Sequence, residues 1–164
     1  MSDAVAAFGA ALGPLADDEA GAREKTHVIH VWSDDRMIQP VPKAASREAA
    51  RLGVHDRFVI QYSGNHARFH DIETLLRLAW SFRPDEGVVF QFIGEGQKKR
   101  LVAERLASDP VSHVYSSTYV EKSLLADSLS MADMGVVAQM PGQERVCYPS
   151  KDRKSTRLNS SHVA

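Results

Sequence analysis

The apolar residues between positions 56 and 138 follow two different periods, and their alternation predicts the fold of the chain. Short runs of branched and aromatic residues are typical of buried strands. Such runs lie at residues 58–62, 88–93, 113–116 and 134–138. Between them, apolar residues recur at a helical period, which predicts helices at residues 71–82, 98–107 and 121–131. Because strands alternate with helices, we expect an α/β protein with a Rossmann-like parallel sheet and helices on both faces.

The first 55 residues have a weaker pattern. Residues 1–25 are rich in alanine and predict a weak helix followed by an acidic turn. Residues 26–32 alternate like a short strand, and the prolines that follow them are typical of a crossing between domains. A short helix closed by Gly53 is predicted at residues 46–52. We therefore interpret residues 26–55 as an interdomain crossing segment and expect the compact unit to begin at residue 56.

A polar turn with one glycine joins the first predicted strand to the first predicted helix of this unit. Asp71 is a good N-cap for that helix, because its carboxylate can accept a hydrogen bond from the first helical turn. Backbone N–H groups near a helix start attract anions, and Gly64 lies just before this start. Arg68 can pair bidentately with a phosphate, although a solvated surface arginine is the alternative. The turn therefore predicts a phosphate site.

A second glycine turn, formed by Gly94, Glu95 and Gly96, follows the next predicted strand. It suits a close approach of the backbone to a phosphate or a ribose. It is not a complete dinucleotide-binding fingerprint, because Lys99 takes the place of the third glycine, and the chain contains no Walker sequence. Alone, it is equally a strand-to-helix turn that needs glycine for backbone reasons. Since the carboxyl ends of parallel strands meet at one edge of a sheet, we expect this turn and that of Gly64 to share one ligand site.

Two histidines of the first turn, His66 and His70, lie four residues apart. This is the spacing of two zinc ligands on a helix, but Ala67 stands where a zinc protease would have glutamate, and no third ligand is evident. We therefore expect no metal site. His70 is expected near the strand ends, where it could donate a hydrogen bond to a sugar hydroxyl or a phosphate.

Three further groups have structural and functional interpretations. The basic run at residues 98–100 is predicted to be a solvated face. Tyr115 and Tyr119 flank a strand end, where an aromatic ring either stacks on a base or packs in the core. Asp133 separates a helix from a strand and is predicted to make a structural turn.

The carboxylates offer no convincing acid/base pair. Glu73 lies in the first turn of a predicted helix, where a negative charge complements the helix dipole. Glu144 lies in a loop at the carboxyl end of a strand and is the one acidic residue considered as a catalytic candidate. No Ser/His/Asp arrangement follows from order and spacing.

Composition narrows the class of protein. The chain has 20 Lys+Arg and 21 Asp+Glu, a net charge of −1, which excludes a basic nucleic-acid-binding protein. Its 164 residues suggest one domain, and a hydrophobic fraction of 43% suffices for a core. Cys147 is the single cysteine, so no internal disulfide can form. No apolar stretch approaches the roughly 20 residues of a membrane span, and we expect a cytoplasmic protein.

The last thirteen residues, 152–164, read DRKSTRLNSSHVA and resemble a translated sequencing adapter. We interpret them as an artefactual tail and leave them out of the functional reasoning. The alternative is a polar, serine-rich disordered tail.

Four ordered motifs together resemble the carboxyl-terminal donor domain of GT-B glycosyltransferases, in particular family 4 sugar transferases that build bacterial surface polysaccharides. The motifs are YSGNHARFHD from Tyr62, FIGEG from Phe92, SMADMGVV from Ser130 and PSK from Pro149. The segment at residues 31–34 also resembles the passage from acceptor to donor domain. The resemblance spans residues 28–151.

The resemblance implies a retaining transfer of a sugar from a nucleotide sugar, usually a UDP-sugar, to a glycan or lipid-linked acceptor, with no cofactor and no essential metal. Its motifs place Gly64 and Asn65 in the loop near the diphosphate and make Arg68 the cation that offsets the diphosphate charge. Gly94 and Glu95 would approach the nucleoside. The remaining donor contacts implied are Tyr119 at the base, His70 near the diphosphate, and Ser150 and Lys151 at the sugar and diphosphate.

Two departures from the family pattern affect the expected site. Ala67 stands where a glycine is common, and His70 stands near where many relatives have lysine. The family's next helix, expected after Lys151 with the later glutamate of an acidic pair, is missing from the chain. We therefore expect residues 56–151 to be an incomplete nucleotide-sugar-binding domain, and residues 1–25 to be a remnant of the acceptor domain or a weak helix.

The isolated chain is accordingly expected to be inactive, with its parent enzyme cytoplasmic and in peripheral contact with the membrane. Two other classes stay open. A nucleotide-sugar epimerase has the same two-domain architecture, and a non-catalytic nucleotide-binding module would have no reacting site.

Overall fold

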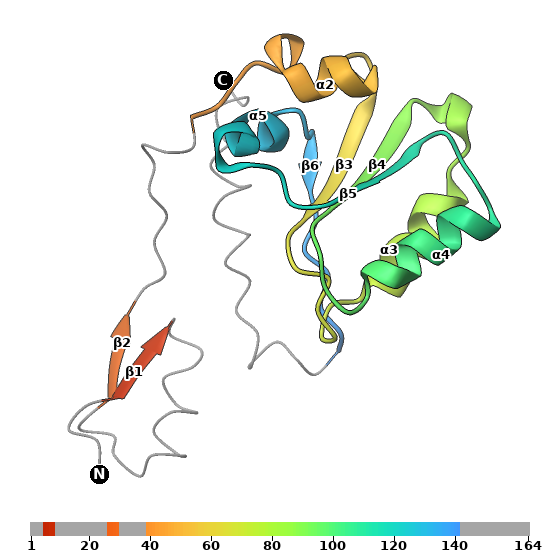
Figure 1. The fold of residues 1–164 in the computed structure, drawn as a ribbon. Helices are drawn as coiled ribbons and strands as arrows, with labels where there is room; N and C mark the ends of the chain where they lie inside the picture. The colour runs from red at the N-terminus through yellow and green to blue at the C-terminus, as the bar shows by residue number, and fades with distance from the viewer. Residues whose placement is uncertain (1–4, 9–25, 30–38, 142–164) are drawn as a thin grey trace.

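The computed structural model describes residues 5–8, 26–29 and 39–141. Its main unit is a four-stranded parallel sheet with the strand order β5-β4-β3-β6 (Figure 1). The strands are β3 (Phe58–Ser63), β4 (Val88–Ile93), β5 (Val114–Ser117) and β6 (Met134–Gly135). The expected Rossmann-like α/β class is confirmed.

The order of the strands reverses beside β3. The chain runs from β3 outward to β4 and β5, and then returns to place β6 on the other side of β3. Ser63 at the end of β3 pairs with Ile93 at the end of β4, and Ile93 pairs with Ser117 at the end of β5. Ligands of open α/β sheets bind outside the carboxyl ends of strands where the order reverses. The loops that follow β3, β4, β5 and β6 therefore form the candidate edge.

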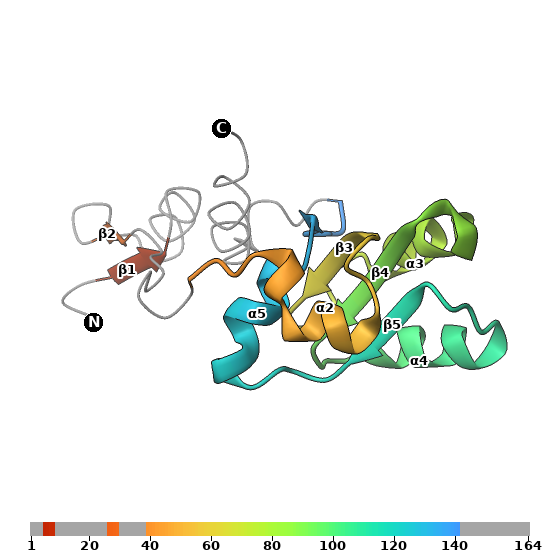
Figure 2. The ribbon, with the colours of Figure 1, turned by 90° about the horizontal axis from the view of Figure 1, so that it is seen from above.

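Helices cover both faces of the sheet, as Figures 1 and 2 show from two directions. Helices α3 (Ile72–Ser81) and α4 (Lys99–Ser108) pack against each other on one face, and α2 (Arg47–Leu52) and α5 (Leu125–Ser130) pack on the other. The core of the first face contains Tyr62, Ile72, Leu75, Leu76, Ala79, Phe90, Phe92, Val102 and Val114. The core of the second contains Ala49, Val54, Val59, Val89 and Met131.

Helix caps fix where the elements begin and end. The Asp71 side chain accepts a hydrogen bond from Thr74 N, which confirms Asp71 as the N-cap of α3. Ser46 caps α2, and Gly53 closes it in the left-handed conformation with φ of 67°. Since α2 packs on the sheet through Ala49, the folded unit extends upstream of the expected start at residue 56.

The amino-terminal elements differ from the expectation. A strand β1 (Val5–Phe8) lies where a weak helix was predicted, and it pairs in parallel with β2 (Thr26–Ile29) in a separate two-stranded sheet. The helix prediction for Val5–Phe8 is wrong because pairing with a distant strand outweighs the local preference of alanine for helix. The strand predicted at residues 26–32 is confirmed over Thr26–Ile29.

Three short 3-10 helices complete the described chain: η2 (Lys43–Ala45), η3 (Pro84–Glu86) and η4 (Lys122–Leu124). The helix predicted at residues 121–131 begins as η4 and becomes α-helical only at Leu125. The last predicted strand is shorter than expected, because only Met134 and Gly135 pair with β3. Within the described residues, no helix is long and apolar enough to cross a membrane.

Polar side chains also lie inside the sheet, although the strands were predicted to be apolar on both faces. Gln61 and Gln91 are opposite each other on β3 and β4 and are almost fully buried. Gln61 Nε2 donates to Gln91 Oε1 and to Ser128 O of α5, both at 2.8 Å. These bonds satisfy the amide of Gln61 and attach α5 to the middle of the sheet.

Candidate functional site

The two predicted glycine turns meet at the carboxyl edge of the sheet. Gly64 N donates to Ile93 O at 2.8 Å, and Gly94 N donates to Ser117 O at 3.0 Å, so each turn continues the ladder of the neighbouring strand. A Cβ atom on Gly94 would lie 2.0 Å from Gly64 O, and Gly94 has φ of 125°. Only glycine permits this contact without displacement of the backbone. The expectation that the two turns lie together is confirmed.

The rest of the two loops is also joined by the backbone. His66 N donates to Glu95 O at 2.7 Å, and Lys98 N donates to His66 O at 2.9 Å. A Cβ atom on Gly96 would lie 2.3 Å from Asn65 Oδ1. The ring of His66 is fully buried, with its centroid 5.0 Å from that of Tyr62. The loop that carries the candidate diphosphate residues is therefore held along most of its length.

Tyr62, Asn65 and His70 form a compact polar group beneath this loop. Tyr62 OH lies 2.7 Å from Asn65 O and 2.6 Å from His70 Nδ1, and His70 Nδ1 lies 2.6 Å from Asn65 O. The sequence placed His70 near the strand ends, and the structure agrees. It did not reveal Tyr62 as the partner of His70, because an aromatic residue in a strand is usually a packing residue.

Lys98 and Lys99 are not simply a solvated face, and this prediction is wrong for both residues. Lys98 Nζ donates to His70 O and to Glu73 Oε2, each at 2.8 Å. Lys99 Nζ donates to Ser117 O at 2.5 Å, and burial lowers the pKa of Lys99. Their physical role is to bind carbonyl groups left at the ends of the loops. Arg100 does lie on an exposed face, where it pairs with Glu104.

The carboxylates at the start of α3 are fixed by local partners. The hydrogen bond from Thr74 lowers the pKa of Asp71. Burial raises the pKa of Glu73, but the hydrogen bond and the positive charge of Lys98 outweigh this effect and leave the pKa below its ordinary value. Glu73 is thus an ion-pair partner of Lys98 in addition to complementing the helix dipole.

Several expected ligand contacts are exposed around this framework. Asn65, Arg68 and Glu95 are exposed, and Arg68 makes no hydrogen bond or ion pair with any other described residue. Tyr119 is 55% exposed, and a Cβ atom on Gly94 would lie 3.1 Å from its ring. These residues therefore surround the junction of the two turns with an amide, a cation, a carboxylate and an aromatic ring.

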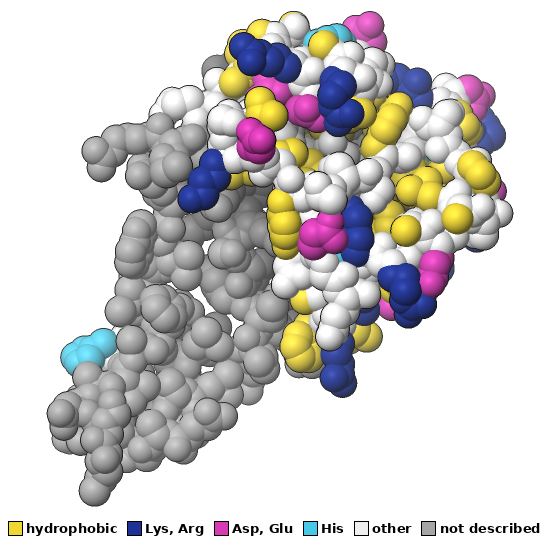
Figure 3. Space-filling view, viewed as in Figure 1, with side chains coloured by type: hydrophobic (Ala, Val, Ile, Leu, Met, Phe, Trp, Pro, Cys, Tyr) yellow, Lys and Arg dark blue, Asp and Glu magenta, His cyan; other side chains and the backbone are white. Residues whose placement is uncertain are grey.

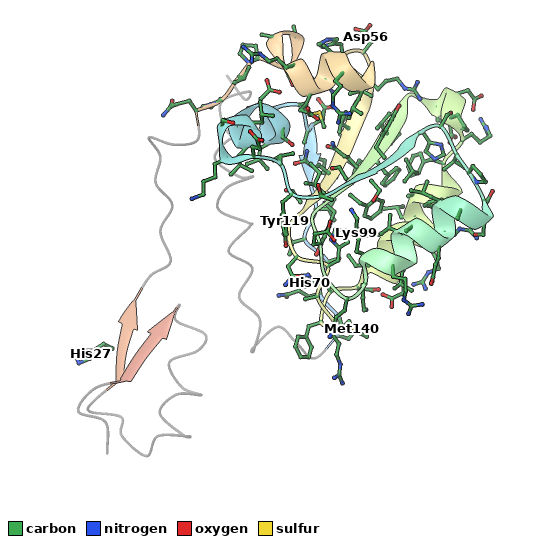
Figure 4. All side chains as sticks on the ribbon, viewed as in Figure 1. His27, Asp56, His70, Lys99, Tyr119 and Met140 are labelled. Carbon is green, nitrogen blue, oxygen red and sulfur yellow. The ribbon has the colours of Figure 1, made fainter. Side chains whose placement is uncertain are left out.

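Figure 4 shows the extent of the candidate edge. Its labels place His70, Lys99, Tyr119 and Met140 at one end of the unit, whereas Asp56 lies at the opposite end. On the face drawn in Figure 3, basic and acidic side chains are interspersed. This distribution differs from the continuous basic surface typical of nucleic-acid binding.

The remaining predicted residues fall in three places. Tyr115 belongs to the core of the α2 face, so packing is its role. Asp133 makes the expected turn, where its carboxylate accepts from Val59 N at 2.7 Å and pairs with Lys43. Glu144, Ser150 and Lys151 lie outside the described residues, as does the tail at residues 152–164. Within residues 39–141 and the two short strands, no cluster of three metal-ligating side chains is found.

Comparison with solved structures finds this fold in glycosyltransferases. Anabaena HepE in complex with UDP-glucose matches with a TM-score of 0.70 and 16% identity, over 85% of this chain and 39% of HepE. HepE in complex with UDP and glucose matches with a TM-score of 0.68 and 18% identity, over 85% and 38%. Sucrose-phosphate synthase from Thermosynechococcus elongatus matches with a TM-score of 0.62 and 20% identity, over 84% and 35%.

These matches establish the fold of the described unit as that of part of a GT-B glycosyltransferase. The chain spans less than two fifths of the length of each of these proteins. Neither the models of known protein families nor the curated proteins match the sequence.

Proposed function

We propose that the chain is the donor-binding part of a glycosyltransferase that transfers a sugar from a nucleotide sugar to a glycan or lipid-linked acceptor. One observation carries this proposal: the turns of Gly64 and Gly94 meet at the carboxyl edge of the sheet, beside the strand at which the order reverses. Such an edge binds nucleotides in other α/β proteins. The solved structures of similar fold support UDP-glucose as the type of donor, since HepE binds it.

The exposed residues of the edge have chemistry that suits the parts of a UDP-sugar. The backbone at Gly64 and Asn65 would approach the diphosphate, and Arg68 would offset its charge as the nucleoside diphosphate leaves. Glu95 would accept hydrogen bonds from the ribose hydroxyls. The exposed ring of Tyr119 would stack on the base.

Transfer requires more than donor binding. An acceptor hydroxyl must be held in line with the reacting carbon, which is the task of a second domain in the proposed parent enzyme. Ser150 and Lys151 are proposed to contact the sugar and diphosphate, and Glu144 remains a catalytic candidate. We therefore propose that the isolated chain binds its donor but does not transfer sugar, that the parent enzyme retains the anomeric configuration, and that it acts at the cytoplasmic face of a membrane without a metal.

Calorimetric titration of the chain with UDP-glucose tests donor binding. Arg68→Gln should weaken binding about 10- to 100-fold, because a hydrogen bond to a charged group contributes about 1.5–3 kcal/mol. Arg51→Gln is the matched control, since Arg51 is an exposed arginine on α2 that pairs with Glu48. Equal affinity of the two variants would contradict the proposed role of Arg68, and the absence of binding by the unmodified chain would contradict the proposed function.

A further inference from the structure

The polar group formed by Tyr62, Asn65 and His70 restricts where protons can lie. Its three atoms, Tyr62 OH, Asn65 O and His70 Nδ1, are all 2.6–2.7 Å from one another. Asn65 O is a main-chain carbonyl and can only accept. Tyr62 OH carries a single proton, so it can donate to one of the two other atoms and not to both.

Only one neutral arrangement leaves no pair of acceptors in contact. If His70 Nδ1 lacked a proton, it would face Asn65 O at 2.6 Å with a lone pair on each atom, whichever way the tyrosine proton pointed. If Nδ1 carries the proton, it donates to Asn65 O and Tyr62 OH, while Tyr62 OH donates to Asn65 O. A buried polar contact without a proton between its atoms is costly.

We propose that Tyr62 and Asn65 O hold His70 as the Nδ1-protonated tautomer, so that Nε2 is the ring nitrogen that gains a proton when an anionic ligand binds. Tyr62 is then a positioning residue: it is 2% exposed and acts through His70 and the Asn65 carbonyl. The tautomer follows from the three distances alone. The role toward a ligand rests on the proposed binding of a nucleotide diphosphate at this edge.

The charges around His70 determine the sign of the pH dependence. Among the described residues, Arg68 lies in the same turn, and Lys98 Nζ donates to His70 O. Asp71 and Glu73 begin α3, and Glu73 is paired with Lys98. These charges are present with and without ligand, whereas the diphosphate adds negative charge only in the complex. Binding should therefore favour the imidazolium of His70 and tighten as pH falls through the histidine range, near pH ~6.5.

Nitrogen-15 NMR of the imidazole groups tests the tautomer in the full chain without any ligand. His70→Gln assigns the His70 signals, and a pH at which the ring is neutral is used. The expected spectrum has a protonated Nδ1 and an unprotonated Nε2, and the opposite pattern would overturn the inference. Tyr62→Phe should lower the fraction of the Nδ1-protonated form, whereas Tyr115→Phe, whose hydroxyl lies 3.4 Å from Leu52 O, should leave it unchanged. An unchanged fraction in Tyr62→Phe would overturn the positioning role of Tyr62.

Titration with UDP-glucose between pH 5.5 and 8 tests the link to the ligand (about one pH unit on either side of an ordinary histidine). Its diphosphate is esterified at both ends and does not titrate in this range. The affinity should fall by up to about tenfold per pH unit as pH rises, and His70→Gln should remove this slope. A flat profile with intact binding would overturn the proton uptake. Failure to bind at any pH, with the tautomer as expected, would overturn the proposed function and leave the tautomer established.

Discussion

The contact between the two glycine turns makes Gly94→Ala the most informative stability variant. The new Cβ would lie 2.0 Å from Gly64 O and 2.8 Å from Gly64 C, distances that no rotation of a side chain can relieve. The φ of 125° adds strain for any L residue, of about 1–3 kcal/mol. Forcing an extra methyl into a packed position typically costs another 1–3 kcal/mol or so. We therefore expect Gly94→Ala to lower the free energy of unfolding by about 2–6 kcal/mol.

Gly53→Ala is the matched control for the contact. Gly53 also has a positive φ, of 67°, but a Cβ there would meet no atom within 4 Å. Its cost should be the left-handed strain alone, about 1–2 kcal/mol. Urea denaturation followed by circular dichroism measures both variants against the unmodified chain. If Gly94→Ala were no more destabilising than Gly53→Ala, the close packing of the two turns would be refuted.

Two further predictions concern the edges and the centre of the sheet. Asp71→Ala should lower the free energy of unfolding by about 1 kcal/mol through loss of the Thr74 N hydrogen bond. Since this bond lowers the pKa of Asp71, its contribution should be present above the ordinary value of 3.8 and be lost as pH falls through the lower folded-state pKa. Gln61→Leu should cost about 1–3 kcal/mol, because it leaves Gln91 Oε1 and Ser128 O buried without their donor.

Each of these predictions has an internal control. Asp71→Asn keeps an oxygen acceptor and should cost much less than Asp71→Ala at neutral pH, and equal losses would contradict the capping argument. The double variant Gln61→Leu with Gln91→Leu should cost less than the sum of the single variants, because it removes both partners of the buried bond. Additive losses would show that the two amides do not interact.

The regular elements of the sheet were predictable because each carries a strong local signal. The strand at residues 88–93 was predicted with the observed bounds, and the N-cap of α3 was predicted from Asp71. Hydrophobic period and capping chemistry depend on residues close in sequence, which is why they were sufficient. The meeting of the Gly64 and Gly94 turns was predictable as well, because parallel topology brings the strand ends to one edge.

The features that sequence reasoning missed depend on partners far apart in the chain. Lys98 and Lys99 look like members of a solvated basic run, yet their acceptors are His70 O, 28 residues away, and Ser117 O, 18 residues away. The strand Val5–Phe8 exists through pairing with Thr26–Ile29, which alanine content does not indicate. Local propensity and charge pattern contain no information about such contacts.

The central claim is that a nucleotide sugar binds at the carboxyl edge of this sheet, and chemical-shift mapping tests it most directly. The nitrogen-15-labelled chain would be titrated with UDP-glucose while backbone amide signals are followed. The account predicts the largest changes at Gly64, Asn65, Gly94 and Glu95, with little change at Asp56 on the opposite edge. No change at these four residues, or larger changes near Asp56, would contradict it.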